Sequence, residues 1–64
     1  MTEAALNELR ERLEQIRLSL RRAMDDALKD GIAPASVMYP LHTAASDIDS
    51  AIDRIGQELK HQHN

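Results

Sequence analysis

The stretch Asp30-Gly31-Ile32-Ala33-Pro34 divides the chain into two helical halves. Gly31 suits the left-handed position just after a helix end, because glycine has no Cβ to clash there. Ile32 is expected to fold back on Leu28 as the hydrophobic contact of this cap. Pro34 suits the first turn of a second helix, where its missing N–H is not needed. A connection this short makes the two helices antiparallel neighbours.

The first helix is expected over about residues 3–29, with Thr2 as its N-cap. Apolar residues recur in this segment at alternating spacings of three and four, which is typical of a helix packed along another helix. They are Leu6, Leu9, Leu13, Ile16, Leu20, Ala23 and Ala27. Oppositely charged residues four apart can pair across one helical turn. These pairs are Glu8/Arg12, Arg10/Glu14, Arg21/Asp25 and Arg22/Asp26.

The second helix is expected over about residues 34–60, followed by a frayed tail at 61–64. It repeats the same apolar spacing at Met38, Leu41, Ala45, Ile48, Ile52, Ile55 and Leu59. Pro40 cannot donate the backbone hydrogen bond of a helix, so it either makes the first turns irregular, which we favour, or moves the regular start to Tyr39-Pro40 with residues 34–38 as a loose turn. Gly56 either weakens the last turns or lets a neighbour approach closely.

The two apolar stripes pair as mirror images about the turn at residues 30–33. Residues that meet across an antiparallel seam have numbers with a nearly constant sum, as in Leu13 with Ile52. Arg17 and Asp49 then flank the seam on one side, where they can form an ion pair. The sequence therefore predicts an all-α fold, an antiparallel two-helix hairpin resembling a coiled coil. It forms a single domain over residues 1–64, which we expect to be completed by dimerisation or by a partner helix.

Length and composition narrow the classes of function. A chain of 64 residues buries only about 60% of its unfolded surface, and it has no cysteine for a disulfide. Association is the remaining way to stabilise so small a fold. The net charge of −3 argues against a nucleic-acid partner. The absence of a membrane-length apolar run and of a signal-peptide pattern predicts a cytoplasmic protein.

The polar residues give no pattern typical of catalysis or metal binding. His61 and His63 are two residues apart, so a helix would place them on different faces, and His42 stands alone. Asp49 and Asp53 are four apart, but no loop supplies the further oxygens that calcium needs. A two-helix hairpin also has no enclosed pocket for a substrate. We therefore expect no catalytic residue, no metal, no cofactor and no small-molecule substrate.

Apolar residues beside the seam predict a surface for a partner. Val37, Ala44 and Ala51 form a column along the second helix, and Met24, Leu18 and Leu28 lie off the seam of the first. Tyr39 is of a residue type enriched at interface hot spots, although its ring could equally cap the end of the bundle. The candidate partner-binding residues are Val37, Tyr39, Leu41, Ala44, Ala45, Ile48 and Ala51. Either a second copy in a four-helix bundle or a different helical protein could cover them.

Three segments resemble the small co-chaperones of type III secretion needle subunits. They are Leu9-Arg10-Glu11-Arg12-Leu13, the turn Gly31-x-x-Pro34-x-x-Val37, and Ile48-x-x-Ala51-Ile52-x-x-Ile55. The resemblance implies a helical hairpin that joins a helical-repeat chaperone and keeps the needle subunit from polymerising in the cytoplasm. It would place the contact surface on Val37, Leu41, Ala44, Ala45 and Ile48.

The sequence thus predicts a non-enzymatic protein-interaction module, in the form of a small cytoplasmic chaperone or adaptor subunit that binds another helical protein. The alternative is a homodimeric four-helix-bundle regulator that binds RNA or a transcription factor. Loss of association in Ala44→Glu with retained helix content would support either one.

Overall fold

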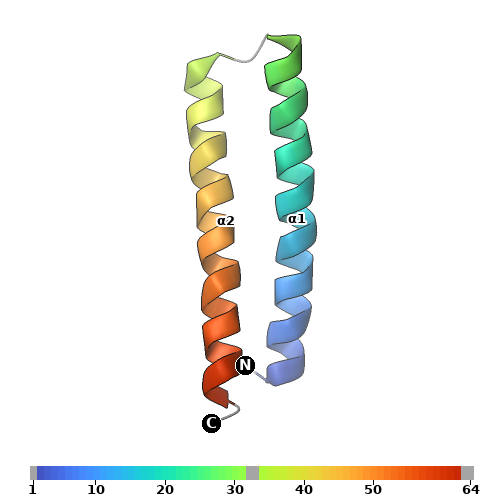
Figure 1. Ribbon diagram of the computed structural model, residues 1–64, viewed down its shortest axis with the longest axis vertical. Helices are drawn as coiled ribbons and strands as arrows, with labels where there is room; N and C mark the ends of the chain where they lie inside the picture. The colour runs from blue at the N-terminus through green and yellow to red at the C-terminus, as the bar shows by residue number, and fades with distance from the viewer. Residues whose placement is uncertain (1, 32–33, 63–64) are drawn as a thin grey trace.

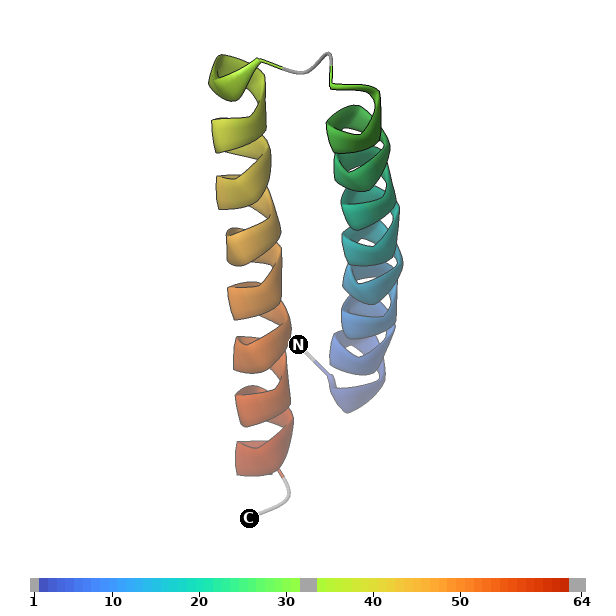
Figure 2. The ribbon, with the colours of Figure 1, turned by 45° about the horizontal axis from the view of Figure 1, so that its top comes forward.

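The computed structural model describes residues 2–31 and 34–62, which form two helices. Helix α1 spans Glu3–Asp30 and helix α2 spans Ala35–Gln62. The helices lie side by side and antiparallel along their whole length in both views (Figures 1 and 2). The described part of the chain contains no strand. The predicted all-α antiparallel hairpin is confirmed.

Both ends of α1 are capped by the residues that the sequence indicates. The Thr2 hydroxyl oxygen accepts a hydrogen bond from the Ala5 N–H at 3.2 Å, which satisfies a donor that the first turn leaves unpaired. Gly31 has φ 66° and ψ 17°, the left-handed conformation of a helix C-cap, and its N–H donates to the Leu28 carbonyl at 3.2 Å. Ile32, expected to pack on Leu28, lies outside the described residues.

Helix α2 begins after Pro34 and runs through Pro40. The Pro34 carbonyl accepts from the N–H groups of Val37 and Met38, each at 3.0 Å, and so starts the helix. Pro40 is the sixth residue of α2, and the helix runs through it, so Pro40 does not mark the start of the helix. The N–H that proline lacks would have bonded the carbonyl of Ser36, which is an exposed residue, so solvent can replace that bond.

The far end of α2 extends beyond the expected boundary. His61 and Gln62, predicted to belong to a frayed tail, continue the helix. Lys60 and His61 lie in its last turn, where basic side chains interact favourably with the negative end of the helix dipole. The remaining tail residues, 63 and 64, lie outside the described residues.

The core is confined to the two ends of an elongated molecule. The radius of gyration is 14.8 Å and the extents are 48 × 16 × 13 Å. A compact domain of this length would have a radius of gyration of about 11 Å. Leu6, Ile55 and Leu59 are buried together at the open end, with Leu13 packed on them. Met24 and Met38 are buried nearer the turn. Among the described residues, those in the middle of either helix are half-buried or exposed.

Helix α1 is rotated relative to the expected seam. Leu6, Leu13, Leu20 and Ala27 are buried or half-buried, as a seam column should be. The column beside them was expected to be Leu9, Ile16 and Ala23, but Ile16 is 51% exposed and Leu9 is 38% exposed. Met24, expected off the seam, is 7% exposed instead. The apolar stripe of α1 is wider than the surface that a single neighbouring helix can cover. Helix α2 covers the part of the stripe that includes Met24.

Two ion pairs join the helices on the side toward which α1 is turned. The Arg17 guanidinium donates to Asp49 Oδ1 at 3.3 Å, and Arg21 lies 3.6 Å from Asp49 Oδ2. The predicted Arg17–Asp49 contact across the hairpin is confirmed. Turning α1 toward Asp49 brings Met24 inward and moves Ile16 outward, because these residues lie on opposite sides of the Leu13 column.

Candidate protein-docking face

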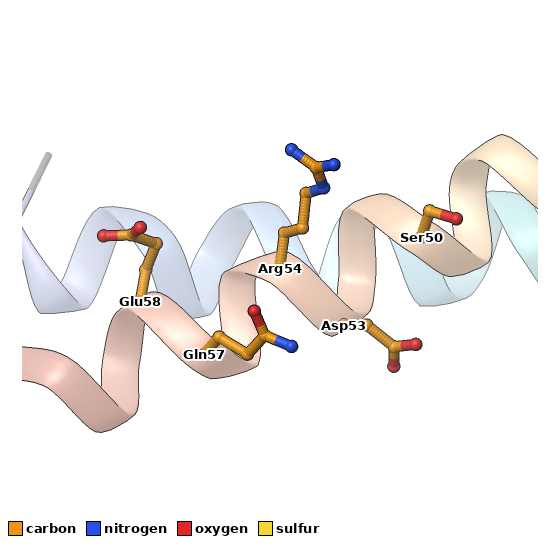
Figure 3. A pocket seen from close by; sticks show the side chains of 5 residues that line it. All are labelled: Ser50, Asp53, Arg54, Gln57 and Glu58. Atoms are coloured by element: carbon orange, nitrogen blue, oxygen red, sulfur yellow. The ribbon is translucent and has the colours of Figure 1, made fainter.

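The surface depressions lined by the described residues are open to solvent. One lies on the outer side of α2, where all five lining residues come from that single helix: Ser50, Asp53, Arg54, Gln57 and Glu58 (Figure 3). No side chain of α1 closes it, so a small molecule would remain largely in solvent there. Ligand-binding pockets usually bury most of their ligand, and this depression lacks the walls to do so.

The candidate metal-binding residues stay apart. Within residues 2–31 and 34–62, no group of three or more His, Asp or Glu side chains is placed to hold a metal ion. Asp49 is occupied by Arg17 and Arg21, while Asp53 is exposed on the outer side of α2. His42 is exposed as well, and His63 lies outside the described residues.

One side of the hairpin is closed by polar contacts. The two ion pairs of Asp49 cross from α2 to α1 on this side. Their side chains are between 38% and 62% exposed, so solvent screens each pair to about 0–1 kcal/mol. Arg21 and Met24 here lie near His42 and Ala45 at the turn end of α2. We call the side of the hairpin that carries Arg17, Arg21 and Asp49 the polar side.

The opposite side carries apolar residues from both helices. In α1, Leu9, Ile16 and Ala23 are spaced seven residues apart and are all exposed. They lie on one side of the seam column, and Arg17 and Met24 lie on its other side. In α2, Val37, Ala44 and Ala51 recur at the same interval across the seam from Asp49. Since the helices are antiparallel neighbours, both columns border the same side. These six residues define the apolar face.

The predicted partner-binding residues are divided among three locations. Val37, Ala44 and Ala51 belong to the apolar face, with Val37 48% exposed and the two alanines half-buried. Leu41, Ala45 and Ile48 are half-buried along the seam toward α1. Tyr39 is 77% exposed, but two residues turn a helix by about 200°, so it lies on the far side from Val37. Tyr39 is therefore not part of the apolar face.

The contribution of α1 to this face was missed from the sequence. The alternating spacing of three and four residues predicts Leu9 and Ile16 to lie in the hairpin seam. The signal that could have found them was the expected contact between Arg17 and Asp49. In the structure this contact accompanies a turn of the column of Arg10, Arg17 and Met24 toward α2, which leaves Leu9 and Ile16 outside.

No protein family, curated protein or solved structure matches this sequence. Neither α1 nor α2, over the residues that the structure describes, contains an apolar stretch long enough to cross a membrane.

Proposed function

We propose that this chain is a non-enzymatic protein-interaction module that packs its apolar face against helices of a partner, as a small chaperone or adaptor subunit would. The observation that carries the proposal is the exposure of Leu9, Ile16 and Val37 along one side of the hairpin. Scattered exposed apolar residues are ordinary, but a contiguous apolar stripe along two adjacent helices favours a docking role.

The energetics of the hairpin support the proposal. Fully burying an aliphatic side chain contributes about 1.5–3 kcal/mol, and three partly exposed aliphatic residues leave a share of that unrealised. Small residues at Ala23, Ala44 and Ala51 would let a partner helix approach closely between the larger side chains. A partner that binds only the folded hairpin also stabilises it by mass action.

The proposal can be tested with single thiols, because the native chain has no cysteine. Ile16→Cys places a thiol at the centre of the apolar face, and Leu18→Cys places one on the outer side of α1. The native side chains are 51% and 47% exposed, so an uncovered hairpin presents both thiols equally to a maleimide.

A partner that covers the apolar face would slow the reaction of the Ile16→Cys thiol with maleimide but not that of the Leu18→Cys thiol. In an extract of the cells that make the protein, we expect the Ile16→Cys thiol to react about tenfold more slowly than the Leu18→Cys thiol. Equal rates for the two variants in the extract would contradict the proposed function.

A further inference from the structure

Granting that the apolar face docks a helical partner, as proposed above, we propose that the partner is a second copy of this chain. The two copies form a four-helix bundle in which the hairpin turns lie at opposite ends. Each helix then packs antiparallel against the same helix of the other copy, α1 on α1 and α2 on α2.

The amount of exposed surface fits such a dimer. The hairpin exposes 5016 Å², whereas a folded monomer of 7.2 kDa exposes about 4,100 Å². The excess is therefore about 900 Å². A standard protein–protein interface removes about 800 Å² from each partner, so one copy docked on the apolar face accounts for the excess.

The apolar column of α1 is complementary to itself. Leu9 and Ala23 lie seven residues on either side of Ile16. When two such columns run antiparallel about Ile16, the two Ile16 side chains meet at the two-fold axis. Leu9 of each copy then faces Ala23 of the other, so a large side chain meets a small one, as interdigitated packing requires.

The charges flanking the apolar column of α2 are complementary in the same arrangement. Asp47 and Arg54 lie seven residues apart on the outer flank of this column, and both are exposed. Among the described residues, neither forms an ion pair within the hairpin. A two-fold axis level with Ile16 places Asp47 of each copy about one helical turn from Arg54 of the other, which gives two attractive pairs.

The alternative two-fold arrangement is disfavoured by charge. If both turns lay at the same end, α1 would face α2 of the other copy in the same register that pairs them within the hairpin. In that register Leu13 lies opposite Ile52, so Arg12 would lie beside Arg54 of the second copy, twice by symmetry. Two pairs of like charges would then oppose association, although the Glu8 carboxylate, which pairs with Arg12 at 2.9 Å within α1, reduces the repulsion.

The identity of the partner is tested on purified protein with the same thiol variants. Slow reaction of the Ile16→Cys thiol relative to the Leu18→Cys thiol, at micromolar concentration and with no other protein present, supports the second copy. Protection in the cell extract but not in purified protein overturns the second copy and leaves the proposed function standing. Equal rates in both settings overturn both.

The arrangement of the copies is tested by reversing one charge. Arg54→Glu should raise the dissociation constant of the dimer about tenfold, because it places Glu beside Asp47 at two contacts. The double variant Asp47→Arg, Arg54→Glu should restore the native value. Tighter association of Arg54→Glu alone would overturn the arrangement, since that result requires Arg12 of the other copy beside position 54. Unchanged affinity in Arg54→Glu would overturn it as well.

Discussion

The two glycines of this hairpin differ in backbone conformation. Gly31 has a φ of 66°, which residues with a Cβ adopt only at a cost, whereas Gly56 has ordinary helical geometry within α2. An added Cβ would meet no atom within 4 Å at either position, so only backbone conformation distinguishes them. The expectation that Gly56 could admit a close neighbour is therefore not met within the hairpin.

The same substitution should act in opposite directions at these positions. Gly31→Ala should lower the free energy of unfolding by about 1 kcal/mol, because it forces alanine into the left-handed region. Gly56→Ala should raise it by about 1 kcal/mol, because alanine restricts the unfolded chain and favours helix. Thermal unfolding followed by circular dichroism at one fixed protein concentration measures both. Changes of the same sign in the two variants would contradict this account.

At the scale of the helices, the boundaries were the most predictable feature. Thr2, Gly31 and Pro34 have side chains or backbone preferences that act locally, so the sequence alone places the helix ends near them. The rotation of α1 was not predictable from spacing, because its apolar stripe is wider than one neighbouring helix can cover. The covered part includes Met24 and lies beside the ion pairs of Arg17 and Arg21 with Asp49, which join residues distant in sequence.

Within α2, Pro40 is expected to lower the free energy of unfolding of the hairpin. It removes a hydrogen bond that the sixth residue of a helix would otherwise make. Pro40→Ala should therefore raise the free energy of unfolding by about 1–3 kcal/mol, with the helix bounds unchanged. Pro34→Ala is the matched control, since it keeps the carbonyl that starts α2 and should lower stability by less than about 1 kcal/mol.

Urea unfolding monitored at 222 nm measures both proline variants. A destabilised Pro40→Ala protein would show that the ring of Pro40 makes a packing contribution that outweighs the missing hydrogen bond. The exposure of Pro40 in the hairpin argues against that outcome.

At the scale of the whole molecule, the sequence predicted that the hairpin needs a partner but not which surface the partner covers. Val37, Ala44 and Ala51 were predicted from α2 alone. The matching column of Leu9, Ile16 and Ala23 emerges only when the rotation of α1 is known. In the proposed dimer these three residues are buried between the two copies. The apolar stripe of α1 then packs against two helices, α2 of its own copy and α1 of the other.

The measurement that most directly tests this account is the solution mass of the chain by sedimentation equilibrium at micromolar concentration. We expect twice the monomer mass of 7.2 kDa for the unmodified chain and for Leu18→Glu, and the monomer mass for Ile16→Glu. A charge at position 16 would be buried at the two-fold axis, whereas position 18 stays in solvent. A folded monomer of the unmodified chain, or equal masses for the two glutamate variants, would contradict the account.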